Sequence, residues 1–489
     1  MTKIINPRFN RHRMYRARVI SIQGATKKEH RVTKLVASLD HFVVRLVLVL
    51  IVGYIVAYGY LVSKGFTFGQ PSWHYALALI PLWLIDGLKG MVENFISATN
   101  KTAEEDLSKV TVVVPSKDGG AALGRTLTDL LGRFAPDHII VVSNGSTDNT
   151  VAIAHNHGVM CLDIEAPVGK VRAIDYAIEH IATPYALLID DDTLIGEAHI
   201  PTALLEQGYE AVAFRVLVNT STWVTKLQMY EYRKSTDIGK RFHNRRASVQ
   251  NISGAIGLFN VSELQRQIDR HTHEFAGEDL QRTLLLHLAS KKKGVVLTDS
   301  TVYTDPPTTL GTLFNQRTLG WFPGLYVNFK NYVRLMFRHG APLPLRYDAF
   351  YNAVLVMIFD VFRLLSLPVL LFYPWYFVYM YATYFVLEMI SYLKCGRQDP
   401  FWVVLAYPFY GLFGFITRIC AMCVFVYRRI VAKLAQAVYF DDYKAASGFT
   451  KVVTVIGVAI IIQAVLVLYI TFSYAKLVGR LTALFILWR

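Results

Sequence analysis

The sequence predicts an α/β domain placed between apolar, helix-forming segments, and three observations support this. Hydrophobic residues make up 53% of the 489-residue chain and its mean hydropathy is +0.33, which is too high for a purely water-soluble protein. The apolar residues gather in long runs on both sides of a central segment, residues 103–340, of ordinary soluble composition. Within that segment, short strand-like runs alternate with helix-like stretches, a pattern typical of a mostly parallel, helix-covered sheet.

The amino-terminal residues 1–38 are crowded with Lys, Arg and His, and the whole chain carries a net charge of +15. Basic residues beside apolar segments favour the cytoplasmic face of a membrane and its anionic lipid headgroups. We therefore predict a basic cytoplasmic tail. The same charge can indicate nucleic-acid binding, but no recognition motif accompanies it, so we expect no nucleic-acid partner.

Residues 39–98 contain two apolar segments, at 41–62 and 74–97, each long enough to cross a hydrocarbon layer of about 30 Å. We predict two transmembrane helices, which return the chain to the cytoplasm before the central segment. The second segment contains Lys89 and Glu93, which are costly in lipid. Either these two residues line a polar pathway, or they pair with each other at their i,i+4 spacing.

After residue 340 the chain becomes apolar again, and we predict three or four membrane-spanning or interfacial helices within residues 348–475, followed by a carboxyl-terminal tail at 476–489. If every segment spans, the basic residues after 426 fall outside the cell, against the usual charge distribution. Residues 401–426 are therefore either a span or a re-entrant or interfacial segment. The candidate segments are 350–372, 375–393, 401–426 and 452–472.

The central segment is organised around the apolar run 185–189, which ends abruptly at Asp190, Asp191 and Asp192. Such a run predicts a buried parallel strand, and open α/β sheets bind ligands at the carboxyl ends of their strands. Alternation along the extended chain points Asp190 and Asp192 the same way. Two carboxylates so placed suit Mg²⁺ or Mn²⁺ bridging the phosphates of a substrate. The alternative is an acidic turn that caps the next helix.

Three other polar turns follow predicted strands. The first contains Pro115 and Asp118, with Asp118 as a possible base or ribose contact, and the second contains Asn144. In the third, Gly169 and Lys170 open a helix whose dipole and lysine can hold a diphosphate. Each turn alone is also consistent with an ordinary capped or solvated turn. Together with the acidic cluster they favour a nucleotide site. The predicted strands are 110–114, 138–142, 185–189, 211–216 and 294–297.

Two later motifs add chemistry. Glu278 and Asp279 follow Gly277 at a predicted helix start, where they are either reactive carboxylates or partners of the helix dipole. The run from Gln316 to Trp321 includes Arg317. Its tryptophan can stack on a sugar or base while the arginine meets phosphate, or it can anchor the chain at a membrane interface.

On these motifs, the sequence resembles the membrane-embedded family 2 glycosyltransferases that make polysaccharides, such as hyaluronan, chitin, cellulose and poly-N-acetylglucosamine synthases. Asp190–Asp192 resembles the metal-binding DxD motif of that family, 277–279 its catalytic-base motif, and 316–321 its interfacial QxxRW element. The resemblance implies a GT-A-like nucleotide-sugar domain over 103–340, with an interfacial element near 313–345.

Two departures concern the donor contacts. Ser143 and Asn144 stand where the family has paired aspartates, so a uracil contact would come from the Asn144 amide. Leu319 stands where the family's arginine is expected, and the tryptophan arrives one residue late. We therefore expect Arg317 to replace that arginine in contacting the diphosphate.

The resemblance implies processive, inverting transfer from a UDP-sugar to a growing polysaccharide, coupled to its export by a multi-pass protein of the plasma (inner) membrane whose catalytic domain is cytoplasmic. Asp190 and Asp192 would hold Mg²⁺ or Mn²⁺ on the diphosphate, and Asp279, with Glu278 beside it, would take the acceptor proton. Alternatives are a transferase that adds one sugar to a lipid carrier, and a transporter or receptor with an inactive domain. No feature of the sequence identifies the sugar or an oligomeric state. The expected donor contacts are Pro115, Asp118, Asn144, Lys170, Asp190, Gln316, Arg317 and Trp321.

Overall fold

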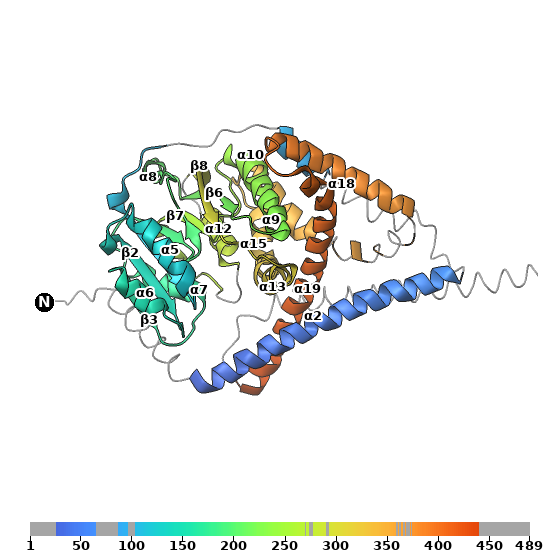
Figure 1. The fold of residues 1–489 in the computed structure, drawn as a ribbon, viewed down its shortest axis with the longest axis horizontal. Helices are drawn as coiled ribbons and strands as arrows, with labels where there is room; N and C mark the ends of the chain where they lie inside the picture. Colours follow the sequence, from blue (N-terminus) through green and yellow to red (C-terminus); the bar gives the residue numbers. More distant parts are fainter. Residues whose placement is uncertain are drawn as a thin grey trace, which may run out of the picture.

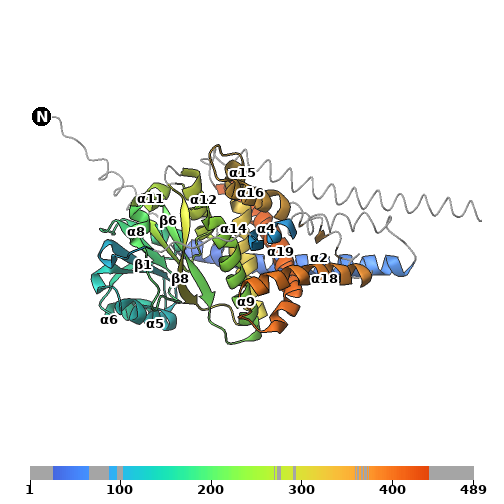
Figure 2. The same cartoon turned by 90° about the horizontal axis from the view of Figure 1, so that it is seen from above.

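The structure is a computed structural model in which an α/β domain packs against a group of long helices (Figures 1 and 2). Of these helices, α2 and α18 extend away from the domain in Figure 1, whereas α19 runs alongside it. The residues that the structure describes are 26–64, 87–95, 103–268, 270–272, 277–289, 293–357, 360, 363, 364, 367, 372 and 374–439.

The domain is built on one eight-stranded sheet with the order β3-β2-β1-β4-β7-β6-β8-β5. The α/β class is as predicted, and four of the seven strand pairs are parallel, but the sheet is mixed, because β7 runs antiparallel to both β4 and β6 and β5 runs antiparallel to β8. In this orientation Ile256, the first residue of β7, pairs with Ile189, the last residue of β4. The loop before β7 therefore lies beside the acidic cluster. The strands are β1 Val110–Ser116, β2 Ile139–Asn144, β3 Met160–Ile164, β4 Tyr185–Ile189, β5 Thr193–Leu194, β6 Ala211–Val218, β7 Ile256–Asn260 and β8 Val295–Thr304.

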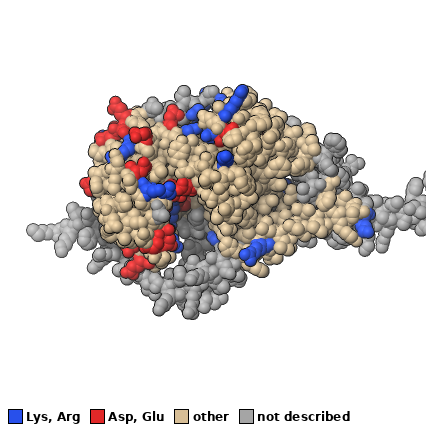
Figure 3. Space-filling view, viewed as in Figure 1, with Lys and Arg blue, Asp and Glu red and all other residues tan. Residues whose placement is uncertain are grey.

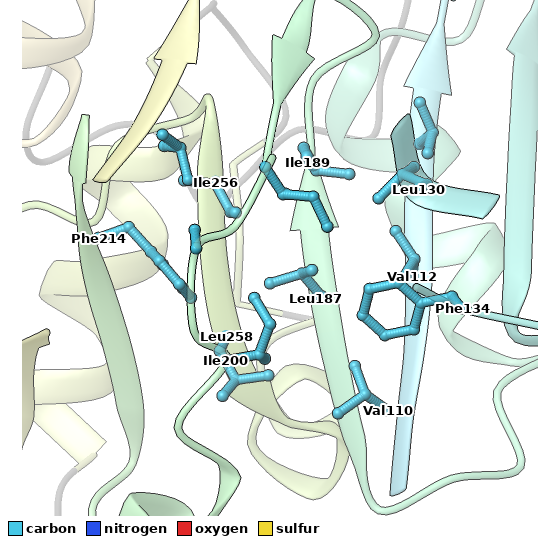
Figure 4. Close-up of a cluster of buried hydrophobic side chains, with 14 of the residues drawn as sticks. Val110, Val112, Leu130, Phe134, Leu187, Ile189, Ile200, Phe214, Ile256 and Leu258 are labelled. Atoms are coloured by element: carbon cyan, nitrogen blue, oxygen red, sulfur yellow. The ribbon is translucent and has the colours of Figure 1, made fainter. Parts of the chain in front are cut away.

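Helices cover both faces of the sheet, as Figure 2 shows for α5 and α6 on one side and α11 and α12 on the other. Alternate residues of the strands point to each face, and on one of them Val112 and Leu187 pack with Leu130 and Phe134 (Figure 4). Each fully buried Leu or Val of this kind contributes roughly 1.5–3 kcal/mol relative to an exposed one. The helices of the domain are α5 Gly120–Leu131, α6 Thr150–Asn156, α7 Lys170–Ile178, α8 Thr202–Glu206, α11 Val261–Gln267 and α12 Glu278–Ala289, with the short 3₁₀ turns η2 Leu107–Lys109 and η3 Pro136–His138.

Two helical stretches beside the sheet contain a π-helical turn each. Helix α9, Trp223–Lys234, continues through η4, Ser235–Lys240, into α10, Arg241–Asn244. Such turns are rare and frequently occur at functional sites. The second stretch runs from α13 through η5 into α14, and further short helices follow it. These elements are α13 Leu310–Asn315, η5 Gln316–Trp321, α14 Phe322–Val327, α15 Phe329–Met336, α16 Leu343–Phe350 and the π-helical η6 Tyr351–Val356.

The apolar segments form helices wherever the structure describes them: α2 Thr26–Ser63, α4 Leu88–Phe95, α18 Pro374–Lys394 and α19 Phe401–Tyr439. Among the described residues, two stretches, His41–Ser63 and Phe401–Ile430, are long and apolar enough to cross a membrane. Helix α18 coincides with the predicted segment 375–393 but is not one of the two. Helix α19 is continuous through Pro408, so no re-entrant break occurs within 401–426.

The other predicted segments are described only in part or not at all. Of residues 74–97, only 87–95 are described, and 350–372 is described at intervals. Segment 452–472 and the tail 476–489 lie outside the described residues, as do residues 1–25 of the predicted basic tail.

Helices α2 and α19 pack along each other through small and branched apolar side chains, including Val44 and Ile51 of α2. The opposite side of α2 exposes a row of apolar residues that nothing described covers, including Phe42, Val49 and Leu50. On the face drawn in Figure 3, Asp and Glu side chains gather over the α/β domain, whereas the helical part is mostly uncharged. The two parts of the molecule thus present different surfaces.

Candidate active site

The three consecutive aspartates diverge at the carboxyl end of β4. The Asp190 backbone N–H donates to the carbonyl of Ala255, 2.9 Å away, in the loop before β7. The Asp191 carboxylate turns back toward β1 and accepts a hydrogen bond from the Ser116 hydroxyl at 2.5 Å. Asp190 and Asp192 instead line a large cavity, and Asp192 accepts a hydrogen bond from the Thr304 hydroxyl at 3.0 Å. Asp190 and Asp192 therefore lie on the same side, but through a turn and not through extended chain, because the Thr193 N–H donates to the Asp190 carbonyl at 3.2 Å.

Lys170, the first residue of α7, joins the acidic cluster to the start of α12. Its ammonium lies 2.5 Å from Asp190 Oδ1 and 3.0 Å from Glu278 Oε1. Burial raises the pKa of Asp190 to about 6, because it outweighs the opposing charge of Lys170. At Glu278 burial also acts to raise the pKa, but there the Lys170 charge prevails and holds the pKa at about 2. The Lys170 ammonium thus pairs with two carboxylates, Asp190 and Glu278, whose pKa values differ.

Two backbone amides hold the Asp279 carboxylate in the same cavity. Gly277 adopts φ +96°, a left-handed conformation that glycine favours, and it starts the turn into α12. Asp279 Oδ2 then accepts from the Gly254 N–H at 3.0 Å, and Oδ1 from the Leu280 N–H at 2.8 Å. Burial and the neighbouring Glu278 charge raise the pKa of Asp279 above its ordinary value. A carboxylate fixed in position with a raised pKa is suited to accept a proton.

The cavity has a volume of about 780 Å³ and extends from Asp190 and Asp279 to the helices outside the sheet. Lys89 and Glu93 of α4 line it, and they form the expected ion pair with each other at 3.8 Å, whereas their place along a polar pathway stays a prediction. On the helical side, the remaining polar and aromatic lining includes Asn94, Glu231, Tyr232, Lys234, Lys240, His243, Gln316, Trp321, Tyr384, Glu388, Ser391 and Tyr407.

Of the three predicted residues in 316–321, Gln316 and Trp321 line the cavity, whereas Arg317 does not. The Arg317 guanidinium donates to Glu231 Oε2 at 2.7 Å and lies over the Trp321 ring, 3.7 Å from its centroid. This arrangement does not put Arg317 against the acidic cluster. Its contact with a diphosphate stays a prediction.

The residues predicted on the first two strands lie outside the main cavity. The Asn144 carboxamide oxygen accepts from the Val168 N–H at 2.8 Å, so it braces the loop that leads to Lys170. Asp118 is exposed and accepts from the Thr147 N–H at 2.7 Å, which ties the first two turns together. Pro115 lines a small cavity of about 20 Å³ that also touches Asp190. Contacts of these three residues with a nucleotide stay predictions.

Sequence reasoning missed the contribution of the π-helical turn η4, above all Lys240. Lys240 lines the cavity and has no ion-pair partner among the described residues. Burial lowers its pKa to about 8, although the charge of Asp279 opposes this change. A single lysine in a helical stretch gives no signal that the helix widens there and directs the residue at the active site.

The residues present fit a divalent metal that a substrate helps to hold. Asp190 and Asp192 both line the cavity, and each has one carboxylate oxygen that accepts no hydrogen bond from the described residues. Within the described part of the chain, no three His, Cys, Asp or Glu residues are grouped so that they could hold a metal by themselves. Mg²⁺ is commonly bound by one or two carboxylates together with substrate phosphates, and the Asp190–Asp192 pair matches that mode.

The α/β fold thus brings an acidic pair, a lysine and the Asp279 carboxylate together around one cavity, an arrangement that suits group transfer. Comparison with known families agrees. Residues 108–321 match the family described as "Glycosyltransferase like family 2", and this match confirms the predicted resemblance over that segment.

Curated relatives are similar over the same part of the chain. The poly-beta-1,6-N-acetyl-D-glucosamine synthase of Staphylococcus epidermidis is 24% identical over 199 residues, which is 38% of this chain and 48% of the relative. The enzyme of the same name from Staphylococcus aureus strain COL is 24% identical over 234 residues, covering 45% of this chain and 55% of the relative. The chain therefore spans about half the length of the curated relatives it matches.

Among solved structures, the mannosyltransferase PcManGT from Pyrobaculum calidifontis, in complex with GDP-Man and Mn²⁺, aligns with a TM-score of 0.45 and 11% identity. That alignment covers 75% of this chain and 99% of the mannosyltransferase. Glucosyl-3-phosphoglycerate synthase from Mycobacterium tuberculosis, in complex with Mn²⁺, UDP and glucosyl-3-phosphoglycerate, aligns with a TM-score of 0.34 and 14% identity over 47% of this chain and 87% of that one.

Proposed function

We propose that this protein transfers a sugar from a UDP-sugar to a hydroxyl group of a growing glycan at a membrane. One observation carries the proposal: a single cavity of about 780 Å³ joins the acidic pair and Asp279 to side chains of α4 and α18. A cavity confined to the strand ends would suit a small acceptor. This one is large enough for several sugar rings, and its outer part lies between helices.

Asp190 and Asp192 would hold Mg²⁺ or Mn²⁺, which when bound would offset the charge that develops on the departing diphosphate. Lys170 lies against Asp190 and adds a second positive charge, at the start of a helix whose dipole has the same sign. The donor is thereby oriented with its sugar toward Asp279.

In the transfer step, the acceptor oxygen forms a bond to the anomeric carbon while the bond from that carbon to the donor phosphate oxygen breaks. The bonding electrons leave with UDP, and the acceptor proton passes to the Asp279 carboxylate. A single displacement of this kind inverts the configuration of the anomeric carbon. Glu278 is a poor proton acceptor because its pKa is held at about 2, so it serves to position Lys170.

On the helical side, Trp321 offers a partly exposed ring on which an acceptor sugar can stack. Beyond it, Glu93, Ser391 and Glu388 give the outer cavity polar groups that can bond sugar hydroxyls. The exposed apolar side of α2 supports insertion in a bilayer. Successive transfers would then advance the glycan between these helices, which is processive synthesis coupled to export.

The test is UDP release by the purified full-length protein with a panel of radiolabelled UDP-sugars and Mg²⁺ or Mn²⁺. We expect one donor to give UDP and labelled product, and Asp279→Asn to give neither. Product length on a gel separates a polymer from the single-sugar lipid product of the alternative transferase. Absence of UDP release with every donor would refute the proposal and favour an inactive domain.

A further inference from the structure

We infer that Arg317 is a positioning residue for the acceptor, and that the membrane-side helix α19 takes part in this positioning through Tyr410. This inference rests on the proposed function, in which Trp321 stacks on the acceptor sugar. The sequence predicts that Arg317 binds the donor diphosphate. We instead assign it to an arrangement of four side chains, which are Arg317, Trp321, Glu231 and Tyr410.

The first observation is the relation between Arg317 and Trp321. Arg317 is 4% exposed and lies behind the cavity wall, whereas Trp321 is 37% exposed and forms part of that wall. The guanidinium lies 3.7 Å from the centroid of the indole ring. A planar cation against the ring fixes its tilt, and the Tyr232 ring lies beside it at 6.1 Å, so the exposed part of the indole is held in place for a ligand.

The second observation is what fixes Arg317 itself. Glu231 Oε2 accepts a hydrogen bond from Arg317 at 2.7 Å and another from the Tyr410 hydroxyl at 2.7 Å. These residues come from three separate elements, α9, η5 and α19. Glu231 therefore links the position of α19 to the position of the Trp321 ring.

The third observation concerns the donor side of the cavity. Lys170 already supplies a cation to Asp190 and Glu278. If Arg317 moved to a diphosphate, it would leave the partly buried Glu231 carboxylate without its cation, and it would also leave the indole ring. The geometry thus favours a fixed Arg317 that acts on the acceptor through Trp321.

The test uses steady-state kinetics of the full-length protein in which the UDP-sugar and a short glycan acceptor are varied separately. We expect Arg317→Met to raise the acceptor KM about tenfold and to leave the UDP-sugar KM unchanged. Arg317→Lys, which keeps the charge but not the planar stack, should recover part of the loss. Tyr410→Phe should raise the same constant by less, and the double variant should show less than the product of the two effects, since both act through Glu231.

Tyr381→Phe is the matched control, because the Tyr381 hydroxyl donates to the Leu405 carbonyl at 2.9 Å between α18 and α19, outside the cavity. It should change neither KM. A rise in the UDP-sugar KM of Arg317→Met with an unchanged acceptor KM would overturn the inference and make Arg317 a donor ligand.

A second readout does not depend on turnover. The fluorescence that is lost when Trp321→Phe is introduced comes from the Trp321 ring. We expect this lost fluorescence to change when it is measured in the Arg317→Met protein, and to stay the same in the Tyr381→Phe protein. Lost fluorescence that stayed the same in the Arg317→Met protein would also overturn the inference. Absence of activity in the wild type would instead refute the proposed function, so the two failures are distinguishable.

Discussion

The two walls of the cavity handle charge in opposite ways. On the sheet side, Asp190, Asp192 and Asp279 face the cavity, and Lys170 is the one cation ion-paired with any of them among the described residues. On the helical side, most charged groups neutralise one another at close range, as in the Lys234–Glu388 pair at 2.7 Å, and Lys240, which has no ion-pair partner among the described residues, is an exception.

Under the proposed function, this difference would separate the two tasks of the site. Uncompensated carboxylates can receive a metal, a diphosphate or a proton, which are the charged participants of the transfer. A wall on which most charges are paired, and which presents the rings of Tyr232, Trp321 and Tyr407, suits the neutral sugars of the proposed acceptor. We therefore expect substitutions on the sheet side of the cavity to affect donor chemistry and substitutions on the helical side to affect acceptor binding.

The largest effect is expected at the sheet wall from Asp279→Asn. The change keeps the volume of the side chain and removes the proton acceptor, so the transfer rate should fall about 10³-fold while UDP binding stays near normal. Single-turnover product formation and equilibrium UDP binding measure the two quantities. Loss of UDP binding with an unchanged rate at saturating donor would make Asp279 a nucleotide ligand and break the division.

The next largest effect is expected from Asp192→Asn, which removes one charge from the acidic pair. We expect transfer to fall by about 10²-fold or more, because a metal contributes several kcal/mol to stabilising the leaving group. Removal of divalent ions by a chelator should act likewise and should reverse when Mg²⁺ or Mn²⁺ returns. Full turnover of Asp192→Asn in metal-free buffer would contradict the metal assignment.

At the helical wall, Trp321→Ala should raise the acceptor KM about tenfold, because a stacked ring contributes roughly 0.5–1.5 kcal/mol beyond its buried area. The UDP-sugar KM and the unfolding midpoint should stay near those of the wild type. Product-length distributions on a gel should shift toward shorter chains. Unchanged acceptor binding with a loss of membrane association would make Trp321 an interfacial anchor instead.

The smallest expected effect is a shift in the pH dependence of the transfer rate, which Asp279 on the sheet side of the cavity should control. The pKa of Asp279 is raised by burial and by the Glu278 charge, and Asp279 must be ionised to accept a proton. The rate should therefore fall as the pH drops through this raised value, above the ordinary carboxylate value near pH 4. Removing the neighbouring charge in Glu278→Gln should move this acid limb of kcat to lower pH. Movement to higher pH would show that another group controls the limb.

The sheet wall could be predicted from the sequence far better than the helical wall. Asp190 to Asp192 follow an apolar run, and Gly277 to Asp279 open a helix, so short local patterns indicate where these carboxylates lie. The other features of the site depend on contacts between residues far apart in the sequence, which short local patterns do not indicate. Strand β7 includes Gly257 and enters antiparallel, and the Glu231–Arg317 pair joins residues 86 positions apart.

The π-helical turns explain a further part of the difference. An ordinary helical periodicity does not direct Lys240 into the cavity, nor does it put Arg317 behind Trp321. In a π-helix each residue advances the turn by a smaller angle, so the face on which a side chain appears shifts. Sequence spacing alone therefore assigns these residues to the wrong face.

Gly277 has a consequence for the construction of chimeric enzymes. A methyl group placed on Gly277 would lie 3.4 Å from Gly324 Cα and 3.5 Å from the Trp321 carbonyl oxygen, and the φ of +96° already disfavours any other residue. At Gly277 the start of α12 therefore meets the backbone of η5 and α14 directly, and beyond it Leu284 of α12 packs in one cluster with Tyr326 of α14. An engineer who exchanges the acceptor wall for that of a relative must transplant residues 277–289 together with 310–327, because a crossover between them would set two unmatched backbones against each other.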